Sequence, residues 1–145
     1  ALSWRHRCGA GARLSYMYPG EHVRRGEPYT SSTRPHTATI RMDYTHRWRG
    51  YSLTAALNGR VLSAVTVDEY TSLTDYSDTR KVRYPAYTMW KLNTSHTFAR
   101  GITVNIAIDN LFNYVPDYYY NNSPTTTGLT FSAGVAVRIE EFFKK

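Results

Sequence analysis

The sequence predicts an all-β protein, an antiparallel up-and-down meander of about six long strands. Three observations support this fold class. Apolar and polar residues alternate with a period of two along most of the 145 residues, as in strands with one apolar face. Short and long connections alternate strictly between these segments. No segment shows the apolar periodicity of a helix.

The first three predicted strands span residues 12–18, 36–48 and 51–68. In the first, Leu14, Tyr16 and Tyr18 share one face, and the start of the chain cuts the pattern short. In the second, the even positions are largely apolar and the odd positions are polar. After a turn at residues 49 and 50 the parity switches, which predicts that the third strand runs antiparallel to the second.

The last three predicted strands span residues 87–98, 102–109 and 129–140. In the fourth, Trp90, Leu92 and Phe98 lie on the apolar face. A tight turn at residues 99–101 leads into the fifth strand. Its apolar row consists of Ile102, Val104, Ile106 and Ile108. The sixth strand alternates from Leu129 onward, so the pattern continues almost to the end of the chain.

The lengths of the strands and of their connections favour a membrane barrel. Strands of soluble proteins usually have about 5 to 6 residues, whereas these patterns hold for roughly twice that length. A strand of about 11 residues, tilted by about 40°, covers roughly 28 Å, close to the apolar band of an outer-membrane barrel. The long loops at residues 19–33, 68–84 and 113–127 would all lie at one end.

Aromatic residues on the apolar parity are expected to form two belts, as at the two interfaces of a membrane. The belt beside the short turns would contain Trp48, Tyr51, Phe98 and Phe143, and the belt toward the long loops would contain Tyr16, Tyr18, Phe112 and Phe131. The opposite parity would line a hydrated interior, with Arg41, Asp43, Arg60, Lys91, Asn105 and Arg138. This is the polarity expected inside a barrel.

Two segments carry a family resemblance. Residues 109–113, "DNLFN", leave an alternating strand and precede a long loop rich in tyrosine, and the last strand ends in Phe142 and Phe143. This order resembles the C-terminal end of TonB-dependent outer-membrane receptors. Residues 122–135, "NSPTTTGLTFSAGV", are similar to receptors of the Bacteroidetes group. Members often end on an aromatic residue, whereas Lys144 and Lys145 follow Phe143 here.

The resemblance covers residues 1–145 as one segment and implies a 22-stranded transmembrane barrel with a plug inside it, of which this chain would be the C-terminal part. It implies a receptor in the outer membrane of a Gram-negative bacterium, with long loops extracellular and the C-terminus periplasmic. Such receptors take up a siderophore-bound iron, haem, cobalamin or an oligosaccharide when the TonB system acts on the plug. The partners would be lipid, the missing plug and strands, TonB and a small nutrient. We expect that the isolated chain does not fold alone.

Candidate ligand contacts lie in two of the long loops. Tyr118, Tyr119 and Tyr120 offer rigid rings with polar tips. His22 is a second candidate, since some relatives take up haem and histidine can ligate its iron. The alternative is that the tyrosines pack on neighbouring loops or stand in the outer aromatic belt. Asp109 and Asn110 in "DNLFN" are interpreted as shaping the end of the strand.

Other function classes find little support. The net charge of +7 is spread along the chain and not clustered, which disfavours nucleic-acid binding. Cys8 is the only cysteine, no catalytic motif is present, and no cofactor or metal spacing occurs, so neither an enzyme nor a metal site is expected. His36 and His46 fall on the apolar parity, where ligation is disfavoured. The main alternative is a small soluble all-β ligand-binding module, because a core-facing row alternates in the same way.

Overall fold

The structure, a computed structural model, describes residues 1–18, 34–71, 77–118 and 126–142 of the chain. This part is almost entirely β. The strands are β1 (Leu2–Arg5), β2 (Ala10–Met17), β3 (Thr37–Trp48), β4 (Tyr51–Leu62), β5 (Val65–Tyr70), β6 (Thr79–Tyr84), β7 (Tyr87–Phe98), β8 (Ile102–Asp109) and β9 (Thr130–Val137). A 3₁₀ turn, η1 (Ala99–Gly101), and a short helix, α1 (Ile139–Phe142), complete it.

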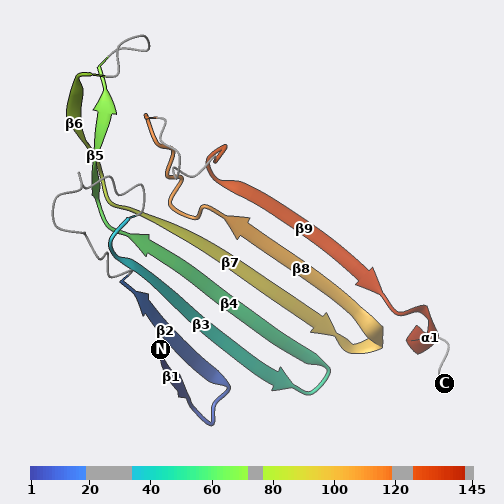
Figure 1. Cartoon of the computed structure of the whole chain (residues 1–145). Coiled ribbons are helices and arrows are strands. Elements are labelled where there is room, and N and C mark those ends of the chain that lie inside the picture. The colour runs from blue at the N-terminus through green and yellow to red at the C-terminus, as the bar shows by residue number, and fades with distance from the viewer. Residues whose placement is uncertain (19–33, 72–76, 119–125, 143–145) are drawn as a thin grey trace.

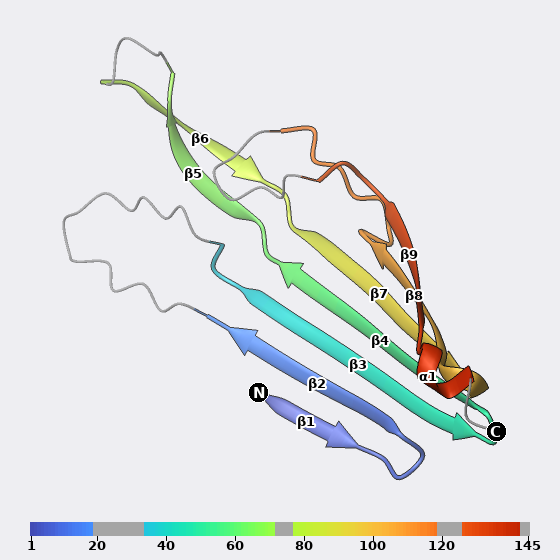
Figure 2. The same ribbon diagram turned by 90° about the vertical axis from the view of Figure 1, so that its right-hand side faces the viewer.

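Seven of the strands form one sheet in the order β1-β2-β3-β4-β7-β8-β9, and every neighbouring pair is antiparallel. Consecutive strands are neighbours except at β4 and β7, between which the chain leaves the sheet to form the separate β5–β6 hairpin. Figures 1 and 2 show this as a twisted strip with the hairpin projecting from one end. The predicted all-β, up-and-down meander is therefore confirmed.

The short connections lie together at the end of the strip away from the hairpin (Figure 2). They use residues with positive φ, which a tight reversal requires: Gly9 at 88°, Gly50 at 82° and Arg100 at 71°. Gly9 also lies so close to β3 that an added Cβ would be 1.9 Å from the carbonyl oxygen of Thr45. Only glycine fits there, because a side chain would displace the β3 backbone.

Three predicted boundaries are wrong. The strand predicted over residues 51–68 ends at Leu62, and Val65 begins β5 in the other sheet, so residues 68–84 contain most of a hairpin instead of a loop. Apolar residues keep the same parity across this break, and periodicity cannot detect a change of sheet. The last strand ends at Val137 and not at residue 140, since the short helix α1 follows. Strand β1 was not predicted, because four residues are too few to show alternation.

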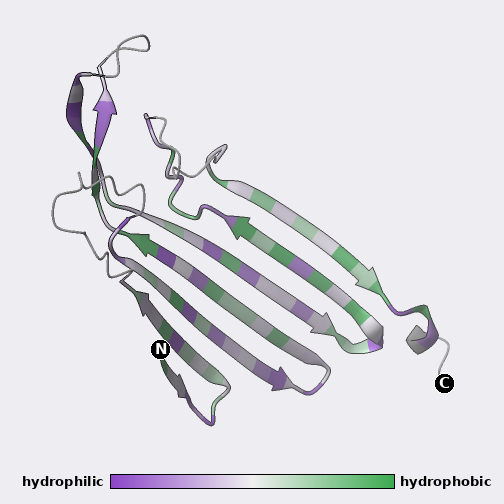
Figure 3. Cartoon of the chain, viewed as in Figure 1, coloured by the Kyte–Doolittle hydropathy of each residue, from purple (hydrophilic) through white to green (hydrophobic). Residues whose placement is uncertain are grey.

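The sheet separates apolar from charged side chains across all seven strands. The register aligns apolar residues in rows, and the central row contains Trp4, Ala12, Met42, Leu57, Leu92, Ile108 and Phe131. The opposite face carries every charged side chain of these strands: Arg5, Arg13, Arg41, Asp43, Arg47, Arg60, Lys91 and Asp109. Figure 3 shows the resulting alternation of hydrophilic and hydrophobic bands along the strands.

Neither face of the sheet is covered by a second layer of the described chain (Figures 1 and 2). Large apolar side chains on the uncharged face stay exposed, including Trp4 at 58%, Phe131 at 63% and Val135 at 68% of their surface. The row from Ile102 to Ile108 is partly exposed in the same way. Among the described residues, buried apolar side chains occur only where the hairpin joins the sheet: Leu62, Val65, Tyr84 and Tyr87.

One contact within the apolar face depends on a glycine. Gly59 and Trp90 are partners in the register of β4 and β7. The indole ring lies over the glycine, and an added Cβ would be 2.5 Å from the ring. Trp90 also meets Phe112 edge to face, with ring centroids 6.1 Å apart. Glycine at position 59 thus lets the indole lie flat on the sheet and reach the aromatic side chain beyond the end of β8.

A candidate binding region at the loop end of the sheet

Two features lie at the end of the sheet opposite the short turns. One is a tyrosine cluster around a buried arginine, and the other is a pocket on the charged face. We define the tyrosine cluster as Arg34, Tyr84, Tyr87, Tyr114 and Tyr118. Its members come from the start of β3, the β6–β7 junction and the segment after β8, so it links connections that are far apart in the sequence.

Arg34 holds the tyrosine cluster together. Its side chain is 3% exposed, and one guanidinium nitrogen donates hydrogen bonds to the carbonyl oxygens of Ser63 at 2.5 Å and Pro85 at 2.6 Å. The other terminal nitrogen donates to the Tyr118 hydroxyl at 3.2 Å. The guanidinium carbon lies 4.6 Å from the centre of the Tyr87 ring, within the range of a cation–π contact. Arg34 thereby joins the β4–β5 and β6–β7 connections to the tyrosine-rich segment.

The tyrosines pack on one another around this arginine. Tyr87 and Tyr114 stack with an interplanar angle of 5° and centroids 5.1 Å apart, and Tyr84 meets Tyr118 at 4.9 Å. The hydroxyls of Tyr114 and Tyr118 are 3.2 Å apart. Burial, followed by the hydrogen bond to Tyr118, raises the pKa of Tyr114 to about 12. The phenol group of Tyr114 is therefore a neutral donor and acceptor at ordinary pH.

The segment "DNLFN" positions Tyr114 through its two asparagines. Asn110 and Asn113 both have φ of 52°, a left-handed conformation that asparagine tolerates. The Asn110 side chain accepts a hydrogen bond from the Tyr114 amide at 2.9 Å and donates to the Tyr114 carbonyl at 2.8 Å. Asn113 accepts from the amide of Leu129 at 2.9 Å, just before β9. Asn110 therefore shapes the end of β8, as interpreted from the sequence, whereas Asp109 pairs with Lys91 and lines the pocket.

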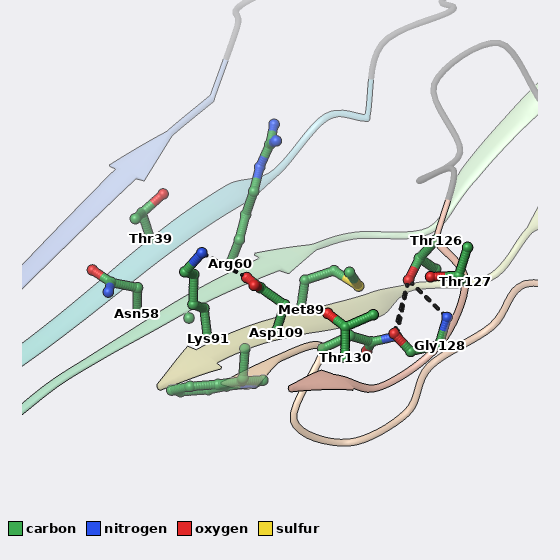
Figure 4. Close-up of a pocket in the computed structure, with 13 residues that line it drawn as sticks. Thr39, Asn58, Arg60, Met89, Lys91, Asp109, Thr126, Thr127, Gly128 and Thr130 are labelled. Atoms are coloured by element: carbon green, nitrogen blue, oxygen red, sulfur yellow. Dashed lines mark hydrogen bonds and ion pairs between the residues drawn. The ribbon is translucent and has the colours of Figure 1, made fainter. Parts of the chain in front are cut away.

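The pocket on the charged face has a volume of about 440 Å³ and lies beside the tyrosine-rich segment. Its lining comes from β3, β4, β7 and β8 and from residues 126–128 and 130, and it includes the apolar side chains of Met89 and Trp90 beside the polar ones. The lining side chains used below are Asn58, Arg60, Lys91, Asp109, Thr126 and Thr130. Figure 4 shows Arg60, Lys91 and Asp109 rising from neighbouring strands, with the Lys91–Asp109 ion pair drawn as a dashed line.

The two cations of this pocket differ in their partners. Lys91 Nζ lies 2.8 Å from a carboxylate oxygen of Asp109, and both side chains are about half exposed. Arg60 has no hydrogen bond or ion pair with any described residue and extends away from the sheet in Figure 4. The charge of Lys91 is thus compensated by Asp109, whereas that of Arg60 has no such partner within the described ranges.

The predicted site residues are only partly within the described ranges. Tyr118 belongs to the tyrosine cluster, where it bonds to Arg34 and packs on Tyr84, so the predicted packing of a tyrosine on neighbouring loops is confirmed for this residue. Its contact with a ligand stays a prediction. Tyr119, Tyr120 and His22 lie outside the described residues.

Three histidines of the apolar parity contact aromatic side chains. The hydroxyl of Tyr16 is 2.6 Å from Nδ1 of His36, and the hydroxyl of Tyr51 is 2.7 Å from Nδ1 of His96. His46 stacks against Trp48, with ring centroids 4.1 Å apart. Across the described ranges, no group of three histidine, cysteine, aspartate or glutamate side chains could hold a metal ion. None of the described helices is long and apolar enough to span a membrane.

Sequence reasoning missed Arg34, Tyr84, Tyr87 and Tyr114. Arg34 and Tyr84 each precede a proline, at "RP" and "YP", and this restricts both residues to extended backbone at the edges of strands. That signal predicts their conformation but not their burial. The cluster forms because the hairpin returns the chain to the sheet beside the end of β4, where Tyr87 pairs with Leu62, and no local pattern indicates this.

Comparisons of the chain with protein-family models, with curated protein sequences and with solved structures give no match.

Proposed function

We propose that this chain is a C-terminal barrel segment of a TonB-dependent receptor, which takes up a nutrient across the outer membrane of a Gram-negative bacterium. The uncharged face of the sheet would contact lipid, and the charged face would line a hydrated interior. The observation that carries the proposal is the complete segregation of charge across seven strands that no second layer covers.

The cost of charge in lipid explains why this segregation is informative. An arginine or lysine facing the middle of a bilayer destabilises a barrel by about 2–4 kcal/mol. A face that contacts lipid must therefore lack charged residues over its whole area. The apolar face of a soluble sheet must lack them only where it packs against the protein core. Polar groups on this face are confined to small hydroxyls and to histidines that contact aromatic rings.

Aromatic residues at the two margins of the apolar face support the same proposal. Trp48, Tyr51 and Phe98 form a chain of ring contacts beside the short turns, with successive centroids 5.3 and 5.2 Å apart. At the other margin Tyr16 and Tyr18 pack on His36. A 12-residue strand such as β3 spans the distance between these margins. At a tilt of about 40° this distance is roughly 30 Å, the thickness of a hydrocarbon core.

The strand directions also indicate what would complete the barrel. In seven strands paired antiparallel throughout, β1 and β9 run in the same direction. They cannot pair with each other in an antiparallel ladder, so closure needs an odd number of additional strands and gives an even total, as bacterial barrels have. Until such strands pair with them, the outer edges of β1 and β9 expose backbone groups that lipid cannot satisfy. The missing strands and plug of the same receptor would supply these partners.

The experiment that tests the proposal places single tryptophans on neighbouring residues of β8. The polypeptide is produced together with its upstream coding sequence, its native tryptophans are replaced by phenylalanine, and either Ile106→Trp or Asn105→Trp is introduced. In vesicles of brominated lipid we expect strong fluorescence quenching of the tryptophan at position 106 and weak quenching at position 105, because only the first faces lipid.

Three outcomes would count against the proposal. Equal quenching at the two positions would show that the two faces of the sheet are equally accessible to lipid. Recovery of the unmodified chain as a folded monomer in plain buffer would favour the soluble binding module. An upstream sequence that encodes no plug-like domain would argue against a TonB-dependent receptor, even if the sheet does enter a membrane.

A further inference from the structure

The charged face of the sheet has an imbalance of charge. Of its eight charged side chains, six are basic and two are acidic. Four of the basic residues occupy adjacent positions in the half of the sheet toward the loop end, and we call this group the cationic patch. It consists of Arg13, Arg41, Arg60 and Lys91.

The like charges of the cationic patch destabilise the sheet. Arg13 and Arg41 are direct partners in the register of β2 and β3, and like charges at directly opposed positions repel each other. Asp43 offsets this only weakly, since its carboxylate is 4.0 Å from Nε of Arg41 and both side chains are solvated. Local stability would favour a neutral residue at one of these positions. A residue pattern that opposes stability is typical of a binding surface.

Arg60 joins the cationic patch to the 440 Å³ pocket. Its partners in the register are Thr39 and Met89, both uncharged, and its guanidinium is free of described partners. Hydroxyl groups of Thr126 and Thr130 and the amide of Asn58 line the same pocket. The Thr126 hydroxyl already donates to the Gly128 carbonyl. The pocket thus offers one guanidinium without a described partner together with the neutral donors of Thr130 and Asn58, and this combination recognises carboxylate or phosphate oxygens.

From these observations we infer that the pocket around Arg60 is a binding subsite for a small solute that carries carboxylate or phosphate groups. This inference rests on the proposed function, because it requires the charged face to line a water-filled space. Arg60 contacts the anion directly, and Arg13 and Arg41 contribute positive potential from the neighbouring strands. Lys91 contributes less while Asp109 neutralises it.

Isothermal titration calorimetry with inorganic pyrophosphate tests the subsite in the polypeptide produced with its upstream coding sequence, without tryptophan substitutions and solubilised in detergent. Saturable binding is expected, with an affinity that falls as sodium chloride is added. Arg60→Gln should weaken it by about tenfold or more, the loss of one charge-assisted hydrogen-bonding group. Arg47→Gln is the matched control. It removes the same charge from the same face at the short-turn end, and should change affinity by less than about twofold.

A third variant is expected to increase the affinity for pyrophosphate. Asp109→Asn removes the carboxylate that neutralises Lys91, so pyrophosphate should bind a few times more tightly. Far-ultraviolet circular dichroism establishes that each variant keeps its strand content.

Three results would overturn the inference: no saturable heat with pyrophosphate, equal losses in Arg60→Gln and Arg47→Gln, or binding of a neutral disaccharide in place of pyrophosphate. Lipid quenching at position 106 is measured in parallel, on the Ile106→Trp variant of the same polypeptide in vesicles of brominated lipid. Quenching without anion binding would refute only the subsite, whereas loss of quenching would refute the proposed function itself.

Discussion

A charge placed on the apolar face should destabilise the protein far more than the same charge placed one residue away. Leu57 lies in the middle of β4, in the central row of the uncharged face, and Ala56 faces the other side opposite Asp43. If the uncharged face contacts lipid, Leu57→Arg should lower the free energy of unfolding by about 2–4 kcal/mol. Ala56→Arg should be nearly neutral, since its guanidinium enters water near a carboxylate.

Urea unfolding of the two variants in lipid vesicles, followed by circular dichroism, measures this difference. A gap of about 2 kcal/mol corresponds to roughly 30-fold in the unfolding equilibrium constant, well above the error of the method. The comparison is internally controlled, because both variants add one arginine to the same strand. A gap below about 0.5 kcal/mol, or a larger loss for Ala56→Arg, would refute the assignment of the faces.

Three further predictions concern single positions. Gly59→Ala should destabilise the protein by about 1–3 kcal/mol, because the new methyl group meets the Trp90 ring at 2.5 Å. Gly134→Ala has open space around the new methyl group and should be nearly neutral, so equal melting temperatures for the two variants would contradict this prediction. Arg34→Met should cost about 2–4 kcal/mol by thermal unfolding, since it leaves two carbonyl groups without their donor; a stability equal to that of the unmodified protein would show that these bonds contribute nothing. Tyr114, whose pKa is raised from 10.0 to about 12, should stabilise the fold fully below pH 10 and lose this contribution as the pH rises toward 12. The loss of stability should be absent in Tyr114→Phe, and an ultraviolet titration in which every tyrosine ionises near pH 10 would contradict the prediction.

Much of the sheet could be predicted from residue parity. The register places Ile106 beside Thr94 and Ala133, and each of these has the parity assigned from sequence alone. Parity works here because a strand has only two faces and a shift of one residue exchanges them. It fails at Leu62, where the chain turns out of one sheet and enters another without changing its alternation.

The candidate binding region was less predictable than the sheet. The prediction that Tyr118 occupies a functional loop depended on composition, which indicates an aromatic surface but not its partners. Its hydrogen bond to Arg34 joins residues 84 positions apart in the sequence. Likewise, Arg60 was assigned to the polar face from its parity, but its lack of a partner depends on the lengths and directions of neighbouring side chains.

The sequence by itself determined the two-faced character of this protein, since alternation decides which side chains share a face once a segment is extended. It also determined two of the tight reversals, because Gly50 and Gly101 permit the positive φ that those turns need. Only the tertiary structure decided that the β5–β6 hairpin leaves the sheet, that Arg34 is buried among tyrosines, and that Lys91 forms an ion pair with Asp109. These features depend on contacts between distant segments, and no local pattern of residues encodes which distant groups will meet.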